Sequence, residues 1–180
     1  MTLIGLYGAP GAGKDTAAGR LVITHGFRAI SFAKPLYEAV AAITGLTVLE
    51  LQDRRNKETP IDWIGKSPRE LLQLLGTEFG RNMIHPDIWV RRAMRDAGEK
   101  CVVTDVRFDN EAEAIREAGG FVFEITRPGE AMIAAGAAAY SSEACIDRSH
   151  INATIENNGT VRDLWAAVDS VVSRLHADIM

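Results

Sequence analysis

Short runs of apolar residues alternate with longer amphipathic stretches along this chain. The runs lie at residues 2–7, 27–32, 101–104, 121–126 and 153–156. Runs of this length, bounded by glycine, proline or asparagine, are typical of strands that are buried on both faces. The stretches between them space their apolar residues as helices do. The pattern therefore predicts an α/β fold with a five-stranded parallel sheet and helices on both faces.

Local signals mark several helix ends. Ser67-Pro68-Arg69-Glu70 combines a capping residue, a first-turn proline and an acid, and it predicts a helix whose apolar face runs from Leu71 to Phe79. The other helices are expected to begin at about Thr16, Pro35, His85, Asp109 and Thr160, and those with clear ends stop near Gly26, Gly45, Gly98 and Gly119.

The connection between the second and third predicted strands is much longer than one crossover helix requires. Nearly 70 residues lie between Phe32 and Cys101, whereas a simple connection needs about a dozen. We expect one domain over residues 1–180 with a helical, acceptor-binding insertion at about 34–98. A helical cap without a binding role is the alternative. Residues 46–67 are polar and predict a mobile loop, and a lid is expected at about 127–151.

The segment between the first strand and the first helix reads Gly8-Ala9-Pro10-Gly11-Ala12-Gly13-Lys14-Asp15-Thr16. This G-x-x-x-x-G-K spacing, between a strand and a helix, predicts a loop whose amides surround a phosphate group. A lysine there places its charge beside the β- and γ-phosphates of a nucleotide. A plain tight turn is the alternative, and it needs no lysine. The expected nucleotide ligands are Gly11, Ala12, Gly13, Lys14, Asp15 and Thr16.

One position departs from the usual pattern of this loop. The residue after the lysine is ordinarily Ser or Thr, whose hydroxyl binds Mg²⁺, but Asp15 stands there and the hydroxyl follows at Thr16. We expect Asp15, Thr16 and Asp105 to hold the metal. In the alternative interpretation, Asp15 caps the helix or faces away from the nucleotide.

Polar residues also follow the other predicted strands. Asp105 and Arg107 come after the third strand, Arg127 after the fourth, and Asn157 and Gly159 after the fifth. Ligands of parallel sheets bind at these carboxyl ends. We expect Asp105 to orient the acceptor or a metal-bound water, Arg107 and Arg127 to neutralise developing charge, and Asn157 and Gly159 to contact the donor base. Local turns and helix caps are the alternatives.

Composition excludes several classes of function. The net charge of −4, without a basic stripe, argues against nucleic acid as the main partner. No apolar run approaches the ~20 residues of a membrane span, and the first run lacks the basic flank of a signal peptide. The two cysteines and four histidines have no metal-binding spacing. We therefore expect a cytoplasmic protein without a protein-ligated transition metal.

Taken together, these segments resemble the deoxynucleoside monophosphate kinases of tailed phages from one end of the chain to the other. The resemblance rests on Gly13-Lys14-Asp15-Thr16, Ser31-Phe32-Ala33 with Pro35-Leu36, Arg69-Glu70-Leu71-Leu72-Gln73, Leu75-Gly76-Thr77-Glu78, Arg81, Trp89-Val90, Asp105-Val106-Arg107-Phe108 with Asn110-Glu111, Arg127-Pro128-Gly129, Ser142-Glu143 and Asn157-Asn158-Gly159-Thr160. Two positions differ from the family: Tyr140 stands where His is frequent, and Lys34 where Asp is frequent.

The resemblance implies a P-loop kinase that transfers the γ-phosphate of ATP to a deoxynucleoside monophosphate (dNMP) with Mg²⁺, often as a homodimer. The acceptor residues expected from it and from the strand ends are Ser31, Phe32, Lys34, Arg69, Gln73, Thr77, Arg81, Trp89, Asp105 and Arg107. Core packing is the alternative role for Trp89. Alternatives for the whole protein are a dephospho-CoA kinase, a kinase of modified bases in DNA, and a nucleotide-binding switch that is not a kinase.

Overall fold

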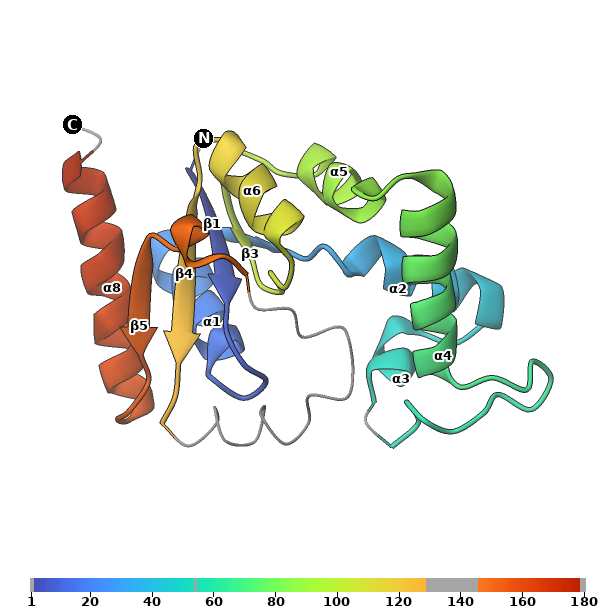
Figure 1. Ribbon diagram of the computed structural model, residues 1–180. Coiled ribbons are helices and arrows are strands. Elements are labelled where there is room, and N and C mark those ends of the chain that lie inside the picture. Colours follow the sequence, from blue (N-terminus) through green and yellow to red (C-terminus); the bar gives the residue numbers. More distant parts are fainter. Residues whose placement is uncertain (1, 54, 129–145, 179–180) are drawn as a thin grey trace. The chain divides into compact units, whose positions relative to one another are not determined.

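The computed structural model describes residues 2–53, 55–128 and 146–178 (Figure 1). The chain divides into two compact units. The first unit combines Met1–Ile30 with Ala97–Met180, and the second consists of Ser31–Asp96. Each unit has its own packing and is described separately below.

A parallel five-stranded sheet forms the centre of the first unit, as the apolar runs predicted. The strand order is β2-β3-β1-β4-β5. β1 lies in the middle, pairing with β3 through Ile4 and Val102 and with β4 through Leu6 and Phe123. The strands are β1 Thr2–Tyr7, β2 Arg28–Ile30, β3 Lys100–Val103, β4 Phe121–Thr126 and β5 Ala153–Glu156. The predicted second strand, residues 27–32, is shorter in the structure.

Helices cover both faces of this sheet. On one face, α1 (Lys14–His25) and α8 (Val161–Asp178) pack on Ile4, Leu6 and Phe123. On the other face, α6 (Asp109–Glu117) lies so close that a Cβ on Gly5 would be 2.5 Å from Ile115 Cδ1. A strand residue without a side chain therefore allows this close approach. A short 3₁₀ helix, η2 Arg148–His150, precedes β5.

A charged group joins α1 to α8 at the surface. Arg20 donates two hydrogen bonds to the Asp169 carboxylate, at 3.0 and 2.6 Å, and His25 Nε2 lies 2.8 Å from the same carboxylate. These contacts, that of Arg20 first, lower the pKa of Asp169 to about 2. The Arg20 guanidinium also lies 5.5 Å from the ring centre of Trp165. The ion pair between Arg20 and Asp169 therefore stabilises the packing of α1 on α8 when the Asp169 carboxyl group is ionised.

The second unit is helical. Its elements are α2 Lys34–Thr44, α3 Val48–Gln52, α4 Pro68–Gln73, the π-helical segment η1 Leu74–Ile84, and α5 Ile88–Arg95. The predicted start of α4 is confirmed, because Ser67 and Glu70 form a reciprocal capping box. None of the helices described here is both long and apolar enough to cross a membrane.

Two predictions for the second unit were wrong. Residues 46–67 were expected to be a loop, but α3 forms there because Thr47 and Glu50 cap its first turn. A single α-helix was expected through Phe79, but from Leu74 the helix widens to the π form. Glycines at this segment permit close packing, since a Cβ on Gly76 would be 2.8 Å from Leu36 Cδ2 and one on Gly80 2.7 Å from Trp89 Cζ2.

Candidate active site

The loop between β1 and α1 is the predicted phosphate-binding segment, and glycines make its backbone path possible. Gly8, Gly11 and Gly13 have φ angles of 147°, 83° and 107°, which residues with a side chain rarely adopt. A Cβ on Gly8 would also collide with the carbonyl oxygen of Ile125. The loop therefore lies directly against β4, near the carboxyl edge of the sheet.

Lys14 is the first residue of α1, and its side chain folds back over the loop. Its Nζ donates hydrogen bonds to the carbonyl oxygens of Gly8 and Ala9, at 2.6 and 2.9 Å. The N-cap residue, Gly13, offers no side chain to the amides of the first turn. An ammonium group, main-chain amides and the positive end of a helix dipole thus occur together, a combination that attracts anions.

Asp15 and Thr16 follow in the first turn of α1. Asp15 is exposed and Thr16 is half-buried. The interpretation in which Asp15 caps the helix is wrong, because Gly13 occupies the cap position. Asp15 lies instead where the helix dipole stabilises a carboxylate.

Asp105 and Arg107 follow β3, and buried groups hold the segment that carries them. Val106 between them is 1% exposed. The carboxylate of Glu111, a residue that is 3% exposed, accepts hydrogen bonds from the amides of Arg107 and Phe108, at 2.7 and 3.2 Å. Glu111 was expected as part of a helix start and of the family motif that follows the third strand. An acid three residues after the N-cap was the signal that it also fixes this strand end.

Of the two arginines considered beyond β4, Arg127 is exposed and Arg148 forms an ion pair. Arg127 is exposed directly after the strand. Arg148 bonds to Glu124 at 3.1 Å, and the same carboxylate oxygen accepts a hydrogen bond from the Thr154 hydroxyl at 2.9 Å. The expected lid at 127–151 falls mainly on residues 129–145, which lie outside the described residues, as does Tyr140.

Asn157, expected to contact the donor base, is turned toward the phosphate-binding loop. Asn157 is 9% exposed, and its side-chain Nδ2 donates a hydrogen bond to the Ala12 carbonyl oxygen at 2.8 Å. Its backbone amide bonds to the Thr126 carbonyl at 2.7 Å. Gly159 is exposed in the turn that leads into α8.

The predicted acceptor residues from Ser31 to Trp89 all lie in the second unit, and Arg69 and Lys34 among them lie beside carboxylates. Arg69 bonds to Glu58 at 2.6 Å, and Lys34 lies 3.8 Å from Glu38. The Ser31 hydroxyl accepts a hydrogen bond from the Lys34 amide at the start of α2. Gln73 and Thr77 are exposed along α4 and η1, Arg81 is half-buried there, and Phe32 is 2% exposed.

Trp89 has a clear packing role in the second unit. Its Nε1 donates a hydrogen bond to the Gly76 carbonyl oxygen at 2.8 Å, and its ring lies against Gly80. The indole therefore joins α5 to the π-helical segment. This contact supports the alternative that the sequence left open for Trp89.

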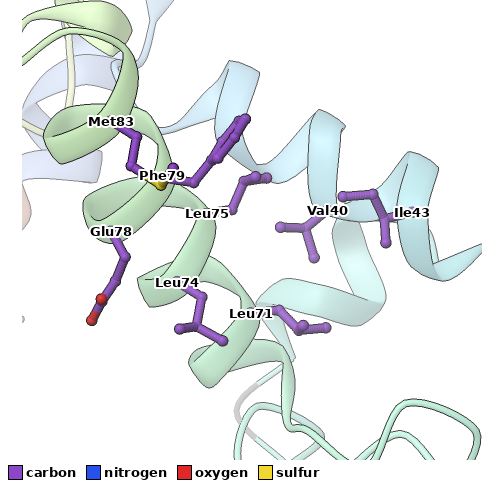
Figure 2. A pocket seen from close by; sticks show the side chains of 8 residues that line it. All are labelled: Val40, Ile43, Leu71, Leu74, Leu75, Glu78, Phe79 and Met83. Atoms are coloured by element: carbon purple, nitrogen blue, oxygen red, sulfur yellow. The ribbon is translucent and has the colours of Figure 1, made fainter.

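An apolar pocket that the sequence did not predict lies between α2 and the α4–η1 helix (Figure 2). Its cavity volume is about 310 Å³. The lining side chains are apolar except for one carboxylate: Val40, Ile43, Leu71, Leu74, Leu75, Glu78, Phe79 and Met83. Several of them are largely exposed, with Met83 at 76% and Ile43 at 56%.

Comparison with known proteins decides the family. A family model for deoxynucleotide monophosphate kinases matches residues 47–168. A protein of Acanthamoeba polyphaga mimivirus, to which this kinase activity is ascribed, is 35% identical over 96% of both chains. The deoxynucleoside-5′-monophosphate kinase of Escherichia phage T5 is 32% identical, over 64% of this chain and 72% of the phage protein. This chain belongs to the deoxynucleotide monophosphate kinase family. The resemblance seen in its motifs is confirmed.

Solved structures place this kinase in the P-loop kinase fold. The dephospho-CoA kinase of Campylobacter jejuni superposes with a TM-score of 0.53 over 100% of both chains, at 16% identity. The shikimate kinase of Aquifex aeolicus gives 0.51 over 98% of both chains, at 14% identity. At this identity the likeness concerns the fold alone. The predicted fold class and the assignment as a nucleotide-using kinase are confirmed.

Proposed function

We propose that this kinase transfers the γ-phosphoryl group of ATP to the 5′-phosphate of a dNMP, giving ADP and the corresponding diphosphate. The observation that carries the proposal is the β1–α1 loop, with its three left-handed glycines and the lysine folded over it. In a member of this family, that loop supplies the site for the donor triphosphate.

On the donor side, the loop amides and the start of α1 bind the phosphate chain. Lys14 exchanges its contacts with Gly8 and Ala9 for the more negatively charged phosphate oxygens, because charge-assisted hydrogen bonds are the stronger ones. Phosphoryl transfer requires alignment and positive charge rather than covalent help from the protein. The backbone of Gly11, Ala12 and Gly13 provides the alignment.

The residues proposed for Mg²⁺ fit the preferences of that ion. Asp15, Thr16 and Asp105 offer carboxylate and hydroxyl oxygens, which Mg²⁺ prefers, and it commonly binds one or two protein groups together with phosphates and waters. In the part of the chain that the structure describes, no group of three or more His, Cys, Asp or Glu residues could hold a metal by itself. The bound ion would offset charge on the phosphate oxygens. Asp105 in addition orients the acceptor oxygen.

On the acceptor side, we propose that residues of the second unit bind the dNMP. The insertion at about 34–98 is then the acceptor-binding part of a single kinase domain. Arg69 and Arg81 bind the acceptor phosphate, and Ser31, Lys34, Gln73 and Thr77 surround the nucleoside. Phe32, which is 2% exposed, and Trp89, which bonds to the Gly76 carbonyl, support these residues by packing within the unit. Arg107 and Arg127 neutralise charge on the transferred group.

We also propose a homodimer in the cytoplasm of the host cell. The exposed apolar side chains that line the pocket, including Phe79 and Met83, support self-association, because contiguous exposed apolar surface often marks an interface. The relatives from a virus and a phage support the location. Sedimentation of the purified protein tests the first point and fractionation of expressing cells the second. A monomer at micromolar concentration would refute the dimer.

The decisive experiment couples ADP formation to a spectroscopic readout with ATP, Mg²⁺ and each of the four dNMPs, their ribonucleotide counterparts and modified pyrimidine monophosphates. We expect ADP to form only when an acceptor is present. Dephospho-CoA and oligonucleotides with modified bases serve as competing acceptors. ATP consumption that does not depend on any nucleotide acceptor would contradict the proposal and favour a nucleotide-binding switch.

A further inference from the structure

The side chain of Asn157 joins the β5–α8 turn to the phosphate-binding loop. Its amide reaches across 145 positions of sequence to the Ala12 carbonyl. Since a carbonyl oxygen can only accept hydrogen bonds, the amide nitrogen of Asn157 must face it. Both residues are nearly excluded from solvent, at 9% for Asn157 and 1% for Ala12. Water therefore cannot easily replace this bond.

The bond fixes the direction of one peptide group in the loop. In a trans peptide, the C=O and the following N–H point in opposite directions, and the structure has no cis peptide among the described residues. With the Ala12 carbonyl held toward Asn157, the Gly13 N–H points away from Asn157. Gly13 also has no room for a side chain, because a Cβ there would be 2.6 Å from Asn157 Nδ2 and 3.2 Å from Leu164 Cδ2.

We infer that Asn157 is a positioning residue for the donor phosphates: it sets the orientation of the Ala12–Gly13 peptide and thereby of a phosphate-binding amide. Its backbone amide, bonded to the Thr126 carbonyl at the end of β4, holds the turn in place. The inference rests on the proposed use of this loop for ATP. It differs from a contact with the donor base, because it assigns the bonded side-chain N–H of Asn157 to the Ala12 carbonyl of the loop.

The test compares Asn157→Ala with a matched control, Asn152→Ala. Asn152 also bonds its side-chain amide to the main chain, but as an acceptor from the Val122 amide at 2.9 Å, and it lies at the amino end of β5. For Asn157→Ala we expect the KM for ATP and the calorimetric Kd for ATP to rise roughly 10-fold, with the KM for the dNMP within about twofold of the wild type. Asn152→Ala, at an exposed residue, should leave both ATP constants unchanged.

Measuring kcat/KM with ATP and with GTP as donor shows whether Asn157 positions a phosphate-binding amide or recognises the base. A residue that orients a phosphate-binding amide weakens both donors equally, so the ratio of their kcat/KM values should be unchanged. A changed ratio, or unaltered ATP constants in Asn157→Ala, would overturn the inference. If instead the wild type binds ATP but phosphorylates no dNMP, the proposed function fails while the calorimetric comparison still decides the role of Asn157.

A measurement on the unaltered protein covers the case in which Asn157→Ala does not fold. The side-chain amide proton of Asn157 that bonds to the Ala12 carbonyl should exchange slowly with solvent. We expect this both without nucleotide and with a non-hydrolysable ATP analogue. Rapid exchange in the nucleotide-free protein would contradict the inference.

Discussion

The two units of this kinase hold their candidate residues in different ways. In the first unit, buried groups fix the backbone of the site: Glu111 bonds to the amides after β3, and Asn157 bonds to the Ala12 carbonyl. In the second unit, Arg69 and Lys34 form ion pairs with exposed partners. Preorganised amides suit the phosphate chain of the donor, which is the same in every reaction cycle. Exposed side chains can adjust to acceptors of different shape.

The apolar residues show the same contrast. The core of the first unit consists of side chains such as Leu6, Phe123 and Leu164 that are almost completely buried. The second unit leaves Ile43, Phe79 and Met83 about half or more exposed. We therefore expect changes in the first unit to affect chemistry or global stability sharply, and changes on the surface of the second to affect mainly acceptor binding.

Lys14→Ala should have the largest effect. Removing the ammonium group takes away positive charge at the donor phosphates, and we expect kcat to fall by about 100- to 1,000-fold. The side chain bonds to the Gly8 and Ala9 carbonyls and is only half-buried, so circular dichroism and the melting temperature should remain close to the wild type. Full activity in steady-state assays would reject the donor site.

A pair of glycine substitutions sharpens the comparison of the units. Gly80→Ala introduces a Cβ 2.7 Å from Trp89 Cζ2 and 2.9 Å from the Leu75 carbonyl oxygen, and we expect this overpacking to destabilise the second unit by about 1–3 kcal/mol. Gly19→Ala, inside α1, has no heavy atom within 4 Å and should stabilise the protein by about 0.5–1 kcal/mol. Urea denaturation measures both, and equal changes would contradict the packing described for η1.

Asp169→Asn tests the surface pair between α1 and α8 by its dependence on pH. Because the folded-state pKa of Asp169 is lowered to about 2, its ionised form stabilises the fold at neutral pH, and this contribution is lost as the pH falls from about 4 to 2. One third of the side chain is exposed, so we expect a loss of about 1 kcal/mol at pH 7. The difference from wild type should shrink in denaturation curves recorded toward pH 2. A constant difference would exclude the ionised pair as its cause.

Arg69→Ala should have the smallest effect on stability. The partners in its ion pair with Glu58 have side chains that are 47% and 62% exposed, and exposed pairs contribute about 0–1 kcal/mol. Thermal unfolding should therefore hardly change, whereas the KM for the dNMP should rise if Arg69 binds the acceptor phosphate. Glu58→Ala breaks the same pair and serves as the control. A KM that rises equally in both variants would assign the effect to the pair rather than to binding.

Much of the sheet could be predicted from local sequence, because strand positions follow from short apolar runs. β1, β4 and β5 have the predicted bounds. The helix after Ser67 was also predictable, since its capping box is contained within four residues. The same signal, Thr47 followed by Glu50, marks α3 and could have identified that helix within the polar stretch.

Features that depend on distant contacts could not be predicted. The apolar spacing from Leu71 to Phe79 fits an ordinary α-helix, and the π form involves the packing of Gly76 and Gly80 against α2 and α5. Likewise, nothing near Asn157 in the sequence indicates that its side chain bonds to Ala12. The loop itself was predictable from its spacing, but the contacts that hold it were not.

The long sequence separation between the phosphate-binding loop and Asn157 has a consequence for how the protein is made. The ribosome produces the phosphate-binding loop early, yet the Asn157 amide that secures it follows 145 residues later. At ordinary rates of translation this interval lasts roughly 7 to 30 seconds. During that time a nascent chain has the loop residues without their support, so nucleotide should stabilise the newly made protein only after β4, β5 and the turn beyond them have emerged.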